Sequence, residues 1–151
     1  MRVTLGRRGH QVGEPEAMVE GLPVRSALGP THNGTVDDTL LFEARALVLA
    51  DLQARRQATA EAVSALEDAC AARKWWAEQW PEGRVFVAGL VAQDVQDSLF
   101  ESRGRWPLCL DCEDEPLHSL YIQPDLGGPD PVWVCEETGS VAAALGHLHS
   151  T

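Results

Sequence analysis

Between Asp37 and Trp80 the chain contains neither glycine nor proline, and alanine is dense. Such a composition favours helix, because the residues that interrupt a helix are missing. Apolar residues recur along the stretch at helical spacing, and they are Leu41, Val48, Leu52, Val63, Leu66 and Cys70. The stretch is therefore predicted to be mostly helical, with Leu41, Leu52, Val63 and Leu66 on its buried face and Cys70 as a small buried hydrophobe.

The length of this predicted helix sets a further condition. An unbroken helix from Asp37 to Trp80 would be about 65 Å long, which is too long to be covered by so small a body. Either it breaks near the polar stretch Gln53–Thr59 and folds back, or it pairs with another chain. We expect a homo-oligomer that associates through this long helix.

A second amphipathic helix is predicted from about Val85 to Ser102. Four apolar residues follow one another there at a spacing of four, and they are Val87, Val91, Val95 and Leu99. The helix could be entered through a short strand at the letters VFV. Because few residues separate the two predicted helices, they should pack antiparallel.

Residues 1–36 are rich in glycine and proline and show no sustained period, which predicts an irregular arm with a short strand at Arg2–Leu5. Thr35 and Asp38 resemble a helix-capping pair. No apolar stretch follows the arginines near the start, so no signal peptide is expected. The longest uncharged apolar run, Val85–Ala92, is too short to span a bilayer. A cytoplasmic protein is expected.

The chain is acidic, with a formal net charge of −11 at pH 7. Residues 81–151 hold twelve acidic and only three basic residues, a net −9. Such a surface repels phosphates, which disfavours nucleic-acid binding and favours a protein partner with a basic surface. Residues typical of A+T-rich codons are scarce, since Lys74 and Ile122 are each the only one of their kind, and this favours a bacterial or phage origin.

Three of the four cysteines lie between residues 106 and 139. Cys109 and Cys112 form a C-x2-C pair, and Cys135 ends the strand-like run PVWVC. A second strand-like run, LHSLYI, is separated from it by turn-forming residues, which predicts a β-hairpin. With Ile122 opposite Pro131, His118 would lie opposite Cys135.

This register brings together three thiols and one imidazole, a set that zinc prefers in tetrahedral sites. The predicted ligands are Cys109, Cys112, His118 and Cys135. His147 is the rival fourth ligand, on a short helix predicted to start near Ser140. The alternatives are a metal-free hairpin held by its own apolar core, or reduced cysteines without a role.

Residues 106–139 resemble a zinc ribbon, which has a C-x2-C knuckle, a hairpin and a second knuckle. The resemblance implies that Cys109, Cys112 and Cys135 are ligands, but Thr138 stands where a ribbon has its fourth cysteine. The segment is also similar to uncharacterised small proteins of high-G+C bacteria, with WP-x-C at its start and W-x-C at its end. They imply no function.

No catalytic motif is recognisable. The chain lacks H-x-E, G-x-S-x-G, H-E-x-x-H and glycine-rich phosphate loops. We therefore expect an α+β protein with an arm (1–36), a helical hairpin body (37–105) and a zinc-ribbon-like hairpin with a terminal helix (106–151). Its expected function is that of a non-enzymatic interaction or adaptor module. The alternatives are a virion or other assembly component and a metal-dependent hydrolase.

Overall fold

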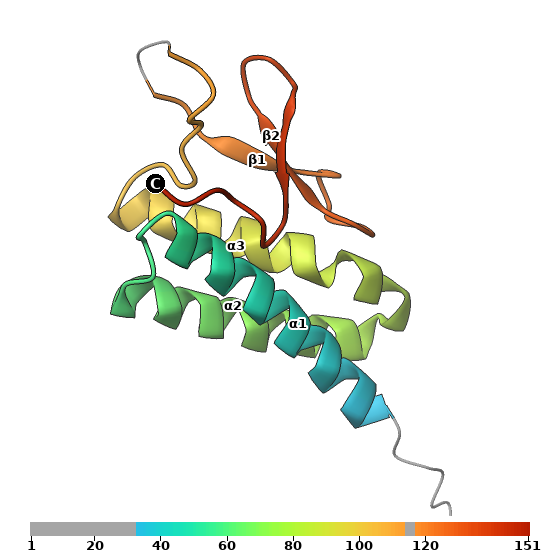
Figure 1. Ribbon diagram of the computed structural model, residues 1–151. Coiled ribbons are helices and arrows are strands. Elements are labelled where there is room, and N and C mark those ends of the chain that lie inside the picture. The colour runs from blue at the N-terminus through green and yellow to red at the C-terminus, as the bar shows by residue number, and fades with distance from the viewer. Residues whose placement is uncertain (1–32, 114–116) are drawn as a thin grey trace, which may run out of the picture. The chain divides into compact units, whose positions relative to one another are not determined.

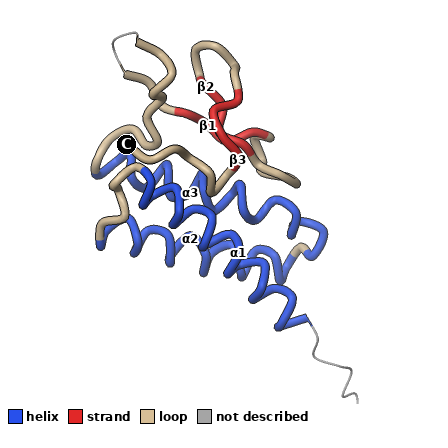
Figure 2. Tube along the Cα trace, viewed as in Figure 1, coloured by secondary structure: helices blue, strands red, loops and turns tan. Residues whose placement is uncertain are grey.

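The computed structural model describes residues 33–113 and 117–151, and the side chains of its first helix from Asp38 onward. A layer of helices carries a small antiparallel sheet on one side (Figures 1 and 2). Its elements are α1 (Asn33–Ala54), α2 (Ala60–Gln79), the 3-10 helix η1 (Pro81–Phe86), α3 (Val87–Ser102), β1 (Leu120–Gln123), β2 (Val132–Cys135) and β3 (Val141–Ala144). The predicted α+β class is confirmed.

Most of the features predicted for the N-terminal part of the chain lie outside the described residues. The strand at Arg2–Leu5 and the capping pair formed with Thr35 lie outside the residues and side chains that are described. Helix α1 begins at Asn33, a few residues before the predicted start at Asp37. No helix in the described part of the chain is long and apolar enough to cross a membrane.

The long helical stretch breaks between Ala54 and Ala60. The N–H of Gln57 donates to the carbonyl of Leu52 at 2.8 Å, and the N–H of Arg56 donates to that of Gln53 at 3.0 Å. Arg56 lies in the left-handed region, with a φ of 53°. This combination is a Schellman motif, in which the last carbonyls of a helix are satisfied by the residues that follow it.

The next helix starts with an N-cap. Thr59 has an extended backbone, and its hydroxyl accepts a hydrogen bond from the N–H of Ala62 at 3.2 Å. The helical stretch therefore breaks and folds back, which was the first of the two alternatives predicted from the sequence. A single long rod is wrong. Self-association through this helix stays a prediction, but the argument from an uncovered rod no longer supports it.

The buried faces follow the predicted patterns in large part. Leu52 and Leu66 are fully buried, whereas Leu41 and Val63 are half-buried. Cys70 is also only half-buried. The four residues that the spacing of four selects in α3 are all buried, and they are Val87, Val91, Val95 and Leu99. The predicted short strand at the letters VFV is wrong, because residues 81–86 form η1.

The sheet has the order β1-β2-β3, with both pairs antiparallel. Ile122 pairs with Trp133, and Leu120 pairs with Cys135. The predicted register, with Ile122 opposite Pro131, is wrong by two residues. Because side chains alternate between the faces of a strand with a period of two, the error leaves every side chain on its predicted face.

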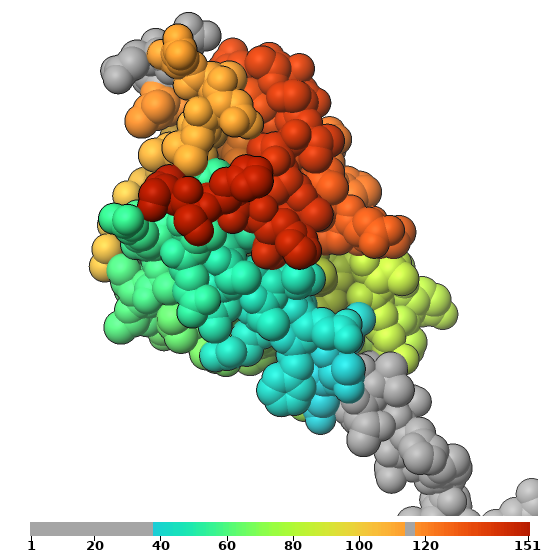
Figure 3. Space-filling model, viewed as in Figure 1, coloured from blue at the N-terminus to red at the C-terminus, as the bar shows by residue number. Residues whose placement is uncertain are grey.

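The predicted helix near Ser140 is wrong, because Val141–Ala144 forms β3. This strand pairs with β2 and has a bulge between Trp133 and Val134. The chain then runs over α1, where Figure 3 shows the C-terminal segment lying across the helix. The backbone N–H of Thr151 donates to the carbonyl of Ala54 at 3.2 Å. Helices and sheet therefore share one hydrophobic core.

A buried carboxylate fixes this arrangement. Asp51, in α1, has an exposed fraction of 0%. It accepts hydrogen bonds from the indole Nε1 of Trp133 at 2.7 Å and from the backbone N–H groups of Gly146 at 2.7 Å and Leu148 at 2.9 Å. One side chain of α1 thus holds both β2 and the C-terminal segment.

Candidate metal centre

The Cys109–Cys112 segment follows α3 and is aligned by backbone pairing with the residues before β1. The N–H of Cys109 donates to the carbonyl of His118 at 2.9 Å, and the N–H of Leu120 donates to that of Pro107 at 2.8 Å. Trp106, with an exposed fraction of 4%, anchors the segment against Trp133, with the two rings edge to face at 5.5 Å. The segment therefore lies beside His118.

The sheet register then brings the third cysteine to the same place. Leu120 is opposite Cys135, so the end of β2 lies next to the residues that precede β1. His118 is two residues before Leu120 and shares its face of the strand. The thiol and imidazole groups of Cys109, Cys112, His118 and Cys135 all lie within 4.8 Å of one another.

The distances in this cluster match those of a tetrahedral site. The Sγ atom of Cys135 is 3.8 Å from that of Cys109, 3.7 Å from that of Cys112, and 3.3 Å from Nε2 of His118. Zinc binds thiolates at about 2.3 Å, so two zinc-bound sulfurs lie about 3.8 Å apart, and a sulfur and an imidazole nitrogen about 3.6 Å. The three distances from Cys135 are close to these values, and the longest separation in the cluster, 4.8 Å, would shorten by about 1 Å on metal binding.

The turn after β2 wraps around the sulfur of Cys135. The backbone N–H of Thr138 donates to this Sγ at 3.4 Å, and the N–H of Gly139 donates to the carbonyl of Cys135 at 2.9 Å. Hydrogen bonding from Thr138 lowers the pKa of Cys135 to about 6, with a further contribution from His118. Thr138, which stands where a ribbon has a cysteine, therefore supports the cluster by hydrogen bonding to Cys135 through its side chain and its backbone.

The half-buried thiol of Cys112 has its pKa shifted in the opposite direction. The hydrogen bond with Cys135, together with burial, raises the pKa of Cys112 to about 12. The pKa values of Cys135 and Cys112 are therefore shifted in opposite directions. A metal ion would replace the thiol protons, since thiolates are the ligand form of cysteine.

The cluster is closed to solvent on most sides. Cys109 and Cys135 are buried, His118 has an exposed fraction of 5%, and Cys112 is half-buried. All four residues predicted from the sequence are brought together. His147, the rival ligand, is exposed and does not belong to the cluster.

Arg55 lies close enough to this cluster to affect it electrostatically. Burial lowers the pKa of its guanidinium, while Asp111, Asp51 and Cys109 act in the opposite direction. Its Nε and Nη1 atoms are buried and have no hydrogen-bond partner among the described residues. Neither Arg55 nor Asp51 was predicted from the sequence. For Asp51, an acid between Ala50 and Leu52 in an apolar stretch of helix was the available signal.

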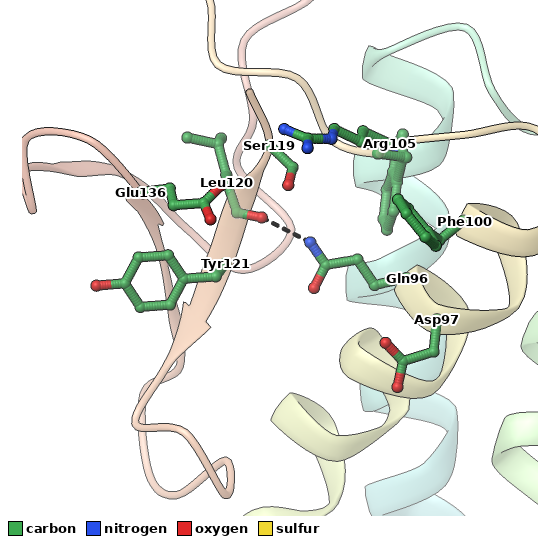
Figure 4. Close-up of a pocket in the computed structure, with 9 residues that line it drawn as sticks. Gln96, Asp97, Phe100, Arg105, Ser119, Leu120, Tyr121 and Glu136 are labelled. Atoms are coloured by element: carbon green, nitrogen blue, oxygen red, sulfur yellow. Dashed lines mark hydrogen bonds between the residues drawn. The ribbon is translucent and has the colours of Figure 1, made fainter. Parts of the chain in front are cut away.

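A groove of about 260 Å³ lies beside the cluster, between α3 and β1 (Figure 4). None of the four clustered residues lines it. The side-chain amide of Gln96 crosses from α3 to β1 and donates to the carbonyl of Leu120 at 2.6 Å. The groove and the candidate metal centre are therefore neighbours but do not share a surface.

Fold and cluster together define a small α+β protein whose sheet carries a closed Cys3His cluster that fits a metal ion. Residues 37–145 match a family described as a domain of unknown function, DUF8819, and the chain belongs to this family. The match covers the three helices almost entirely, all four clustered residues and the three strands. No curated protein and no solved structure matches the chain.

Proposed function

We propose that the chain is a non-enzymatic protein-interaction or adaptor module with a structural Zn²⁺ held by Cys109, Cys112, His118 and Cys135. The observation that carries the metal assignment is the set of sulfur–sulfur distances, 3.7 and 3.8 Å, which equal the edge of a zinc tetrahedron. Three thiolates and an imidazole also select zinc over the harder divalent cations, which prefer oxygen.

A structural role for the metal follows from the number of ligands. Four protein ligands complete the tetrahedral shell of zinc, so no position is open to a substrate or a reactive water. The burial of Cys109, His118 and Cys135 excludes solvent further. Binding energy at such a site becomes folding energy for the short strands that supply the ligands.

The interaction role is supported by charge and by the absence of catalytic sequence motifs. A net charge of −11 favours a partner with a basic surface. The closed ligand set gives no support to a metal-dependent hydrolase. The break after Ala54 removes the long helix that favoured an assembly component. An adaptor is therefore the function that we carry forward.

Elemental analysis of protein purified without chelators tests the metal. We expect about one zinc per chain in the wild type. His118→Ala should weaken zinc binding by at least about 10-fold, since the loss of a ligand should exceed the 10–100-fold effect of losing an outer-shell partner. The matched controls are His147→Ala and Cys70→Ala, which remove the same side-chain types outside the cluster and should retain zinc.

Two outcomes would contradict the metal assignment. One is a wild-type protein without any bound metal, in which the sheet is held by packing around Trp133 alone. The other is equal zinc retention in His118→Ala and His147→Ala. Light scattering with and without a chelator tests the remaining part: an adaptor should stay small, whereas rings or larger species would indicate an assembly component.

A further inference from the structure

The groove between α3 and β1 has an unusual set of unpaired charges. Asp97 lines it from the helix, Glu136 from the turn after β2, and Arg105 from the segment that follows α3. Within residues 33–113 and 117–151, none of these three side chains forms an ion pair. By contrast, Arg73 and Arg103 are each held by a carboxylate. The charges of the groove are therefore available to a ligand.

Gln96 adds a fixed acceptor to the two carboxylates. Its amide nitrogen is committed to the carbonyl of Leu120, so its amide oxygen remains as an acceptor beside Asp97 (Figure 4). Phe100, one turn further along α3, lines the same groove with an exposed fraction of 61%. Carboxylates beside an exposed aromatic ring suit a lysine or arginine side chain, whose apolar stem lies along the ring while its charge meets the acids.

Donors without acceptors line the same groove. Arg105 lies on the other side of Gln96 from Asp97 in the view of Figure 4. Trp106, also a lining residue, has an exposed fraction of 4%, and its indole N–H has no acceptor among the described residues. A buried N–H group without an acceptor is unfavourable.

We infer that this groove binds a peptide segment of a partner protein through a lysine or arginine side chain. The cationic group is held by Asp97 and the amide oxygen of Gln96, and its stem lies on Phe100, while Glu136 adds negative charge from the opposite wall of the groove. A peptide carbonyl accepts a hydrogen bond from the guanidinium of Arg105. The inference rests on the proposed adaptor function and names the chemistry of the partner.

The test uses the zinc-containing full chain to select from a random peptide display library. Enriched peptides are synthesised, and their affinity is measured by fluorescence anisotropy. Two variants alter the groove, Asp97→Asn and Glu136→Gln. Two matched controls, Glu101→Gln and Glu137→Gln, alter exposed acids that do not line it, at neighbouring positions of the same elements. Each of the four substitutions removes one negative charge, so the long-range attraction between the protein and a basic peptide changes by the same amount in all of them.

We expect enriched peptides to contain lysine or arginine. Their affinity should fall about 10-fold in each groove variant and less than about 2-fold in each control, since a tenfold loss corresponds to about 1.4 kcal/mol. Equal losses in all four variants, or enriched peptides without a basic residue, would overturn the inference. Loss of self-association in Asp97→Asn, with no loss of peptide affinity, would assign the groove to a second copy and overturn it as well.

The outcomes separate this inference from the proposed function. Peptides that bind with full affinity to both groove variants would leave the adaptor function standing and remove the groove from it. A library that yields no binding peptide at all would count against both. Zinc content is measured on the same preparations, so a failure of the metal assignment is recognised independently of peptide binding.

Discussion

Among substitutions of an acidic residue by alanine, Asp51→Ala should lower the free energy of unfolding the most. The substitution removes the acceptor of three hydrogen bonds, from the Trp133 indole and from the backbone of Gly146 and Leu148. A buried donor left without an acceptor costs about 1–3 kcal/mol, so three donors give an upper range of about 3–9 kcal/mol.

Two effects reduce this loss. The variant no longer buries a charged group, and water can reach the half-buried Gly146. We therefore expect the free energy of unfolding to fall by about 3–5 kcal/mol, which is a large part of the 5–15 kcal/mol typical of a domain. Asp51→Asn keeps one acceptor oxygen but turns an amide N–H toward one of the donors, and it should lose about 2 kcal/mol.

Urea unfolding followed by circular dichroism measures the effect, on samples with equal zinc content. The matched control is Asp38→Ala, in the same helix. Asp38 is about half exposed and pairs with Lys74 at 2.9 Å, so its loss should cost less than about 1 kcal/mol. The reasoning is wrong if Asp51→Ala loses less than about 1 kcal/mol, or if Asp38→Ala loses as much as Asp51→Ala.

Two further substitutions or reactions test local features. Arg56→Gly should raise the free energy of unfolding by up to about 1 kcal/mol, because Arg56 has a φ of 53° that glycine adopts without strain. The control is Gln53→Gly, one turn earlier in α1, which should lower the free energy of unfolding by about 1 kcal/mol. A less stable Arg56→Gly in urea unfolding would contradict the assignment of the helix end. Burial raises the pKa of Cys70 to about 11. The rate of its alkylation by iodoacetamide should therefore be low at neutral pH and rise about tenfold per pH unit up to that value. Mass spectrometry measures this rate, with Cys70→Ala as the control. A plateau of the rate near pH 9 would contradict the raised pKa.

The helices were predictable because burial imposes a period on the sequence. The spacing of four in α3 selected residues that are all buried. The break after Ala54 was harder to predict, because helices most often end at glycine and this one ends at Arg56 in a left-handed conformation. A polar stretch indicated where the break could fall, but not that it would occur.

The composition of the candidate site was predictable, and the register of its strands was not. The alternation along β1 places His118 on the face of Leu120 whatever the exact pairing, so an error of two residues moved no ligand to the wrong side. The register itself depends on the conformation of the long loop between Gln123 and Val132, which turn-forming residues alone do not determine.

Features that depend on distant partners could not be predicted from local patterns. Residues 141–144 read Val-Ala-Ala-Ala, which is compatible with a helix, but pairing with β2 makes them a strand. The donors to the Asp51 carboxylate come from Trp133 and the C-terminal segment, which are distant in the sequence. Nothing in the sequence around Asp51 indicates these partners.

The hydrogen bonds of Asp51 also bear on the order in which the protein can fold during synthesis. Gly146 and Leu148 follow Asp51 by 95 and 97 residues, so a ribosome completes all three helices long before either N–H group has left the exit tunnel. Until then the helices can pack only around a carboxylate that has not yet met its donors. We therefore expect the nascent helical layer to stay loosely packed until Gly146 and Leu148 have emerged and can donate to Asp51.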